Sequence, residues 1–156
     1  MKIRWKELIV AVLIPLAAGG LAAWITTDNM AMFDEIAKPP LAPPRWLFPV
    51  AWTILYILMG IASYLIYVSD APKEQKSSSL TLYGIQLLLN FFWSIIFFNL
   101  RSYLFAFIWL VFLWIFILAS LLSFKKTSKT AAYLMIPYLV WVTFAGYLNF
   151  GIYLLN

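Results

Sequence analysis

Charged residues occur in this chain only at intervals that match the thickness of a lipid bilayer. Five stretches contain no Asp, Glu, Lys or Arg, namely residues 8–27, 46–69, 77–100, 102–124 and 130–156. Each holds 20 to 27 residues, and about 20 helical residues cross a hydrocarbon core of about 30 Å. The pattern predicts an all-α integral membrane protein that forms one domain over residues 1–156. We expect a five-transmembrane-helix bundle with spans at about 7–27, 46–68, 78–100, 103–124 and 130–154.

The composition agrees with a chain whose main solvent is lipid. Apolar residues make up 65% of the sequence and charged residues 11%, and the mean hydropathy is +0.91, well above that of soluble domains. The chain has no cysteine and no histidine, which excludes disulfides, thiolate nucleophiles and the usual protein ligands of zinc and haem. We therefore expect no metal site and no tightly bound cofactor.

Basic residues are distributed unequally between the two sides of the predicted bundle. Three lie on one side (Lys38, Arg45 and Arg101) and eight on the other: Lys2, Arg4, Lys6, Lys73, Lys76, Lys125, Lys126 and Lys129. In a plasma membrane this bias predicts a cytoplasmic N-terminus and an external C-terminus. The net charge of +5 follows from the same bias and from attraction to anionic lipids, so it requires no nucleic-acid partner.

The longest predicted connection, residues 28–45, is rich in proline. Pro39, Pro40, Pro43 and Pro44 restrict the backbone and prevent a regular helix there, which predicts a stiff, extended lid over the helices below. The alternative is a plain helix connection with an interfacial tryptophan at Trp46. This segment alone favours neither interpretation.

Aromatic and amide side chains share helix faces in three of the spans. Trp52 and Tyr56 lie one turn apart in the second span, Gln86 and Asn90 in the third, and Trp141 in the fifth. An unpaired amide in hydrocarbon costs about 1–3 kcal/mol or more, so we expect both amides to face the bundle interior. Interhelical hydrogen bonding explains the amides alone, whereas convergence of the rings and Asn90 under a lid favours a ligand pocket.

Small residues dominate one part of the first span, Ala17-Ala18-Gly19-Gly20-Leu21-Ala22-Ala23. Such a run lets another helix approach closely, and we interpret it as helix packing or as the contact face of a homodimer.

Three motifs follow one another along the chain. They are Lys38-Pro39 and Pro43-Pro44-x-Trp46-x-Phe48 continuing to Trp52-Thr53-x-Leu55-Tyr56-x-x-Met59-Gly60, then Gln86-Leu87-x-Leu89-Asn90-x-x-Trp93-Ser94-x-x-Phe97-Phe98, and then Pro137-Tyr138-Leu139-x-Trp141-x-x-Phe144-Ala145-x-x-Leu148-Asn149. Together they resemble the second-, third- and fifth-helix signatures of the TspO/MBR family, the tryptophan-rich sensory proteins and translocator proteins. Met32-Phe33 stands where that family commonly has Trp-Tyr.

The resemblance implies a bundle, often dimeric, that binds porphyrins such as protoporphyrin IX and, in some members, sterols or synthetic benzodiazepine-type ligands. It implies a ligand site made of Phe33, Pro43, Trp52, Tyr56, Gln86, Asn90, Trp141, Phe144, Ala145 and Leu148. Some bacterial relatives degrade protoporphyrin IX in light and oxygen, and the residues that match Trp52 and Trp141 are implicated as catalytic. A cholesterol motif would need a basic residue after Tyr153, which this chain lacks.

The chemistry of these residues suits a flat dicarboxylate ligand. A porphyrin would stack on indole and phenol rings, and its propionates would meet Lys38 or Arg45 near the mouth. A carrier of tetrapyrroles or sterol-like lipids and a non-catalytic stress sensor remain as alternatives. Because every charge lies at a span boundary, ion-coupled transport is disfavoured, but no sequence feature separates a sensor from an enzyme.

Overall fold

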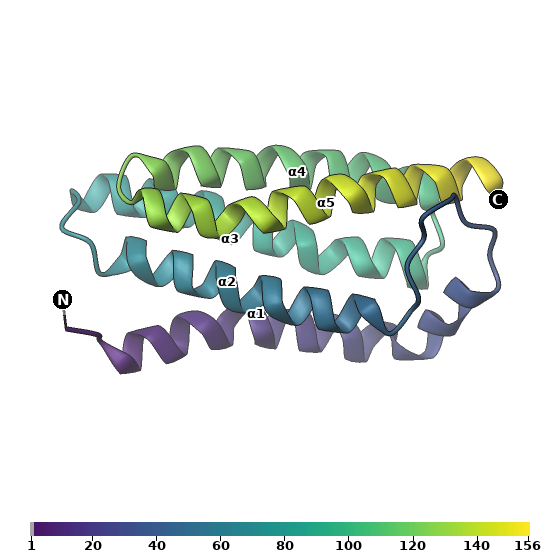
Figure 1. Ribbon diagram of the computed structural model, residues 1–156, viewed down its shortest axis with the longest axis horizontal. Coiled ribbons are helices and arrows are strands. Elements are labelled where there is room, and N and C mark those ends of the chain that lie inside the picture. The colour runs from purple at the N-terminus through teal and green to yellow at the C-terminus, as the bar shows by residue number, and fades with distance from the viewer. Residues whose placement is uncertain (1) are drawn as a thin grey trace.

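The computed structural model describes residues 2–156 and has five long helices that run side by side along one axis (Figure 1). They are α1 (Trp5–Thr26), α2 (Leu47–Tyr67), α3 (Lys73–Ser94), α4 (Tyr103–Lys125) and α5 (Lys129–Leu155). All five are long and apolar enough to cross a membrane, and no strand occurs in the described part of the chain. The predicted all-α five-helix bundle is confirmed.

The two chain ends lie at opposite ends of the bundle, as an odd number of crossings requires (Figure 1). The end of the bundle that holds the N-terminus, here called the N-terminal end, also carries the connections 68–72 and 126–128. The opposite end, here called the C-terminal end, carries the connections 27–46 and 100–102. The helix α3 begins at Lys73 rather than near residue 78, because its first turn is polar and the helical hydrogen bonding extends beyond the apolar stretch. The side chain of Ser128 caps α5 by accepting a hydrogen bond from the Ala131 backbone nitrogen at 3.1 Å.

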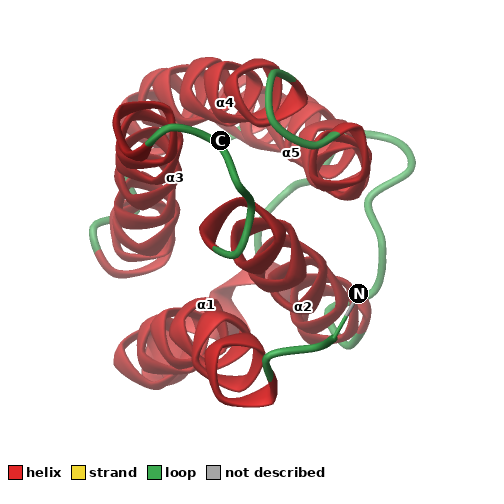
Figure 2. Ribbon diagram, turned by 90° about the vertical axis from the view of Figure 1, so that its left-hand side faces the viewer, coloured by secondary structure: helices red, strands yellow, loops and turns green. Residues whose placement is uncertain are grey.

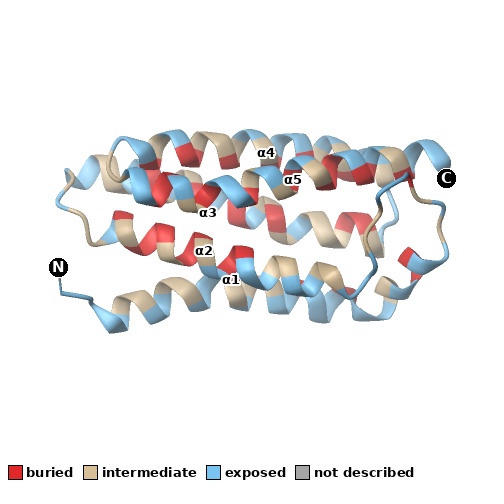
Figure 3. Ribbon diagram, viewed as in Figure 1, coloured by how far each residue is buried: buried red, intermediate tan, exposed pale blue. Residues whose placement is uncertain are grey.

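Seen along its axis, the bundle has the neighbour order α1, α2, α5, α4, α3 (Figure 2). The helix α1 is the peripheral member, and only Pro15, Ala22 and Thr26 of its residues are buried. The other four helices carry most of the buried positions (Figure 3). The small residue Gly60 lets α1 and α2 cross closely, because a Cβ at this position would lie 2.7 Å from the Val12 Cα and 2.8 Å from the Ala11 carbonyl oxygen.

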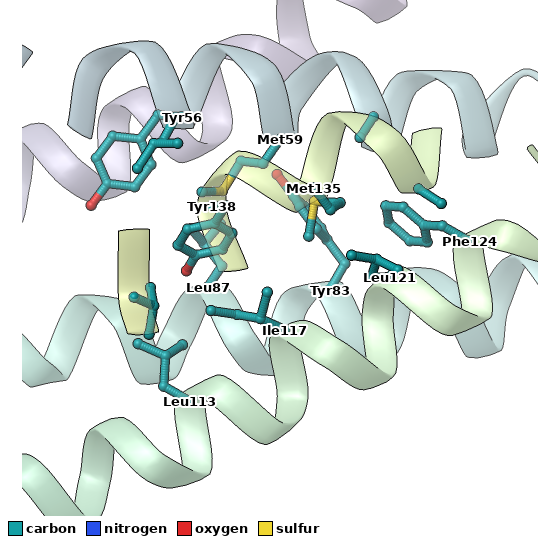
Figure 4. Packing of buried hydrophobic residues seen from close by; sticks show 14 of the residues in the cluster. Tyr56, Met59, Tyr83, Leu87, Leu113, Ile117, Leu121, Phe124, Met135 and Tyr138 are labelled. Atoms are coloured by element: carbon teal, nitrogen blue, oxygen red, sulfur yellow. The ribbon is translucent and has the colours of Figure 1, made fainter. Parts of the chain in front are cut away.

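The N-terminal half of the bundle is closely packed. Tyr83, Ile117, Phe124 and Met135 meet there between α3, α4 and α5, as Figure 4 shows. Ile117, Phe124 and Met135 have no exposed surface. The cavity described below lies beyond this core, toward the C-terminal end of the bundle.

The connection between α1 and α2 has two parts. Its first part is a 3₁₀ helix, η1 (Thr27–Asp34), and its second part, around the prolines, is not helical. The prediction that residues 28–45 form an extended lid is wrong for residues 28–34, which are helical because the prolines that prevent helix begin only at Pro39. Met32 and Phe33 of this first part pack inward.

The proline segment is attached to the last turns of α5. The Tyr147 hydroxyl donates to the Pro40 carbonyl oxygen at 2.7 Å. The Asn156 side chain accepts from the Ala37 backbone nitrogen at 3.2 Å and donates to the Ala37 carbonyl at 2.8 Å. Gly151 leaves space for Pro39, whose Cγ would be 2.5 Å from a Cβ at position 151. We call these contacts the lid latch.

The close crossing of α1 and α2 predicts opposite effects for two glycine substitutions. Gly60→Ala is expected to lower the free energy of unfolding by about 1–3 kcal/mol, because its Cβ meets backbone atoms that side-chain rotation cannot move. Gly84→Ala in α3 meets nothing within 4 Å and is expected to be neutral or stabilising by up to about 1 kcal/mol. Thermal unfolding in detergent measures both, and equal shifts would contradict the close crossing.

Candidate functional site

A cavity of about 260 Å³ lies in the C-terminal half of the bundle, between α1, η1, α2, α3 and α5. Its walls are mainly apolar and aromatic. The rings that line it are Phe33, Phe48, Trp52, Tyr56, Trp93, Phe97, Phe98 and Trp141. This combination of rings with a few polar groups is typical of sites for flat hydrophobic ligands.

The two cavity tryptophans are perpendicular to each other. Their ring centroids lie 6.4 Å apart with an interplanar angle of 86°. Trp52 stacks on Tyr56 at 5.6 Å and 27°, and it meets Tyr138 edge to face at 6.1 Å. Phe48 lies edge to face against Trp141 at 6.0 Å. A planar ligand that stacks on one indole would therefore meet the edge of the other.

The wall opposite these rings is made of small residues of α1. Gly19, Gly20, Ala22 and Ala23 line the cavity. A side chain at Gly19 would collide with the Tyr56 ring, whereas Gly20 faces open space. The interpretation of this run as helix packing missed its place on the cavity wall, because the sequence does not reveal which helix faces it.

The cavity opens sideways, between the later turns of α1 and the first turns of α2. The lining residues Gly20 and Ala23 are exposed on α1, and Pro49 and Thr53 are exposed on α2. The inner walls, by contrast, include the buried residues Ala145 and Leu148 of α5. In a membrane-spanning bundle this side opening faces the hydrocarbon.

Below the cavity, four buried side chains form a continuous hydrogen-bond network. The Tyr56 hydroxyl donates to Asn90 Oδ1 at 2.9 Å, and Asn90 Nδ2 donates to the Tyr138 hydroxyl at 2.7 Å. The Tyr138 hydroxyl donates to Gln86 Oε1 at 2.7 Å. Both amides face the interior, with 0% of Gln86 and 4% of Asn90 exposed. The network joins α2, α3 and α5 and holds Tyr56 in the cavity floor.

At the cavity mouth, the two basic residues of the lid differ in position. Arg45 lines the cavity, and its Nη1 lies 3.1 Å from Asp34 Oδ2 in an exposed ion pair. Lys38 Nζ donates to the carbonyl oxygens of Phe33 at 2.7 Å and Ile36 at 3.0 Å. Its ammonium group lies 5.0 Å from the centroid of the Phe33 ring. Arg45 is thus the cation that faces the cavity.

Of the ligand-site residues expected from the sequence, Phe33, Trp52, Tyr56, Trp141, Ala145 and Leu148 line the cavity. Gln86 and Asn90 lie in the network below it, Phe144 packs against Trp141 at 5.8 Å, and Pro43 lies in the proline segment without lining the cavity.

Several lining residues were not predicted. Trp93 donates from Nε1 to Asn149 Oδ1 at 3.0 Å, which ties α3 to α5 at the cavity wall. A π-helical turn, η2 (Ile95–Asn99), follows α3 and carries Phe97 and Phe98. Such a turn shifts the helix register. The motif Trp93-Ser94-x-x-Phe97-Phe98 was the available signal for these rings, and Trp93 and Phe97 follow Asn90 at helical spacing.

The network predicts that loss of the Tyr138 hydroxyl lowers the free energy of unfolding substantially. Tyr138→Phe leaves Gln86 Oε1 without a donor and Asn90 Nδ2 without an acceptor, and we expect a loss of about 2–4 kcal/mol in the free energy of unfolding. Tyr133→Phe, on the exposed side of the same helix, serves as the control. Equal thermal stability of the two variants in detergent would refute a structural role for the network.

Comparison with known proteins gives one consistent result. Residues 11–155 match the sequence model of the TspO/MBR family. The chain is 44% identical over 124 residues to the tryptophan-rich protein TspO of Chlorobaculum tepidum, covering 80% of this chain and 78% of that protein. It is 36% identical over 151 residues to the tryptophan-rich protein TspO of Archaeoglobus fulgidus, covering 96% and 97%. It is 33% identical over 148 residues to the translocator protein of Ovis aries, covering 94% and 88%.

Proposed function

The chain belongs to the TspO/MBR family of multi-pass membrane proteins, and from this premise we propose that it binds a porphyrin such as protoporphyrin IX in the aromatic cavity. The observation that carries the proposal is the corner formed by Trp52 and Trp141, with Tyr56 stacked beside it. A planar macrocycle that stacks on one of these indoles would also contact the edge of the other.

The absence of the usual metal-ligating side chains favours a metal-free tetrapyrrole over haem. The chain has no histidine or cysteine, and the described residues contain no cluster of the usual metal-ligating side chains. A ligand held only by stacking and hydrogen bonding needs no axial ligand. The macrocycle would extend through the opening between α1 and α2, so that part of it contacts lipid. Other hydrophobic small molecules would use the same walls.

We further propose that light and oxygen drive degradation of the bound porphyrin, with Trp52 and Trp141 as the catalytic residues. Both indoles line the cavity and lie in contact with any stacked ring system. The chemistry would be photo-oxidative, since the cavity lining contains no carboxylate or imidazole for acid–base catalysis.

The charge distribution supports an arrangement in the plasma membrane with the N-terminus in the cytoplasm and the C-terminus outside. The cavity mouth with Arg45 would then face outward, as would the proline segment. Ala17, an exposed member of the small-residue run on α1 that does not line the cavity, is available to a second copy of the chain, in keeping with a homodimer.

Substitution of either indole separates binding from reaction. Trp52→Phe and Trp141→Phe keep an aromatic ring, so we expect a dissociation constant for protoporphyrin IX within about ten-fold of the unsubstituted protein, equivalent to about 1.4 kcal/mol. We expect the light-dependent loss of the porphyrin absorbance band to fall several-fold. Titration in darkness followed by illumination with oxygen measures both quantities. Full activity in both variants would refute the catalytic assignment, and no saturable binding by the unsubstituted protein would refute the receptor.

Arg45 is expected to recognise the propionate groups. Arg45→Gln should weaken binding of the free acid by about 1 kcal/mol, or about five-fold in Kd, because the guanidinium is partly exposed. The dimethyl ester of the same porphyrin, which lacks the carboxylates, should bind both proteins equally. Lys38→Gln is expected to lose less, since the Lys38 ammonium group is engaged by two backbone carbonyls. Equal losses for acid and ester would contradict a charge contact.

A further inference from the structure

A line of aromatic contacts runs from the cavity to the surface of α5. Trp52 meets Trp141 at 6.4 Å, Trp141 meets Phe144 at 5.8 Å, and Phe144 stacks on Tyr147 at 6.2 Å and 26°. Tyr147 is 44% exposed, and its hydroxyl contacts the exposed residue Pro40 of the lid. The line therefore ends where a phenol reaches the polar edge of the bundle.

Indoles and phenols are the uncharged side chains that lose an electron most easily, and electron transfer is fast between rings in contact. A cavity that holds a photoexcited pigment against two indoles exposes those indoles to one-electron oxidation. An indole radical that is not reduced goes on to react with oxygen, which destroys the side chain. A nearby electron donor that reduces the indole radical back to the neutral indole would protect the side chain.

Two tyrosines lie closer to Trp52 than Tyr147 does, but neither can complete such a transfer. Tyr56 and Tyr138 are buried, and their hydroxyls donate to the amide oxygens of Asn90 and Gln86. A phenol that loses an electron must also release its proton, and an amide oxygen accepts a hydrogen bond without serving as a base. The hydroxyl of Tyr147 also donates to an amide oxygen, that of Pro40, but this contact is exposed at a connection outside the helices. Exposure to water at that connection is what would let the Tyr147 proton leave.

We propose that Tyr147 is the terminal electron donor of a relay that restores the cavity indoles after oxidation, an inference that rests on the photochemistry proposed above. The excited porphyrin takes one electron from Trp141 or Trp52, and the porphyrin radical anion passes it to dioxygen, which becomes superoxide. Tyr147 then gives one electron to the indole radical cation across Phe144, and its phenolic proton goes to water.

The tyrosyl radical is reduced by a water-soluble hydrogen-atom donor of the thiol or ascorbate class, which supplies one electron and one proton. The sum is oxidation of one donor and reduction of one dioxygen, with Trp52, Trp141 and Tyr147 returned to their starting states. The relay determines how many photo-oxidations Trp52 and Trp141 undergo before they are irreversibly oxidised. It is a separate reaction from the degradation of the porphyrin.

The chain offers a matched control for Tyr147. Tyr153 lies on the same helix toward the same end and is 38% exposed, but its ring neighbour is Phe150, which packs on Phe107 of α4 and not on a cavity ring. Because Tyr147→Phe also removes a contact of the lid latch, Phe144→Leu serves as a second variant that interrupts the relay and keeps the Tyr147–Pro40 hydrogen bond.

The first experiment illuminates protoporphyrin-loaded protein in lipid nanodiscs with oxygen. Samples without a reductant are frozen for electron paramagnetic resonance, so that the tyrosyl radical persists. Samples with ascorbate are analysed by peptide mass spectrometry for oxidation at Trp52 and Trp141. We expect Tyr147→Phe and Phe144→Leu to lose most of the tyrosyl signal and to accumulate oxidised tryptophan several-fold faster, while Tyr153→Phe behaves as the unsubstituted protein. Unchanged signal and unchanged tryptophan oxidation in Tyr147→Phe would overturn the relay.

The second experiment needs no porphyrin. Azide radicals generated by pulse radiolysis oxidise indoles directly, and the conversion of indolyl to tyrosyl radical is followed by absorbance. The highly exposed residues Trp5, Trp24 and Trp46 are replaced by phenylalanine in the background protein to favour the cavity indoles. Loss of the fast tyrosyl phase in Tyr147→Phe but not in Tyr153→Phe supports the relay, and retention of that phase overturns it. A relay seen here without porphyrin photochemistry would refute the proposed enzyme activity alone.

Discussion

Polar atoms inside a membrane-spanning bundle must be satisfied by one another, and the phenol–amide network of Tyr56, Asn90, Tyr138 and Gln86 is where this constraint acts most strongly. Each of three helices contributes to it, so a rotation or shift of any one helix would leave a donor or acceptor unpaired. The positions of the cavity rings depend on this arrangement, because Tyr56 stacks directly on Trp52 and Tyr138 meets its edge. The network therefore works as a rigid base on which the aromatic corner is built.

The cavity exists because the two halves of the bundle pack differently. In the N-terminal half, Gly60 brings α1 against α2, and bulky side chains fill the space between α3, α4 and α5. In the C-terminal half, α1 presents glycine and alanine to a row of large rings on the other helices. Small residues thus have two different effects on one helix pair, a close crossing at one level and an open wall at the other.

Much of the fold follows from the spacing of charges, because an unpaired charge in hydrocarbon is costly enough to mark every span boundary. The aromatic members of the site, Trp52, Tyr56 and Trp141, were predictable from helical spacing and from the family motifs. The place of Asn90 below the cavity was not, because an amide can face a ligand or a neighbouring phenol with the same periodicity. Phe97 follows Asn90 at helical spacing, but no residue pattern predicts the π-helical turn at Ile95–Asn99 that carries Phe97 and Phe98.

The lid latch has a consequence for how a ligand of the kind proposed would enter and leave the cavity. Tyr147 and Asn156 bind backbone groups of the proline segment, and Asn156 also donates to the carbonyl oxygen of Ile152, which lines the cavity. A ligand that passed the proline segment would have to break these hydrogen bonds on the way in and on the way out, so on that route they would raise the barriers to association and dissociation alike. A ligand that used the side opening between α1 and α2 would leave the latch closed. The latch would thus govern exchange with the aqueous side of the cavity and not exchange with the bilayer.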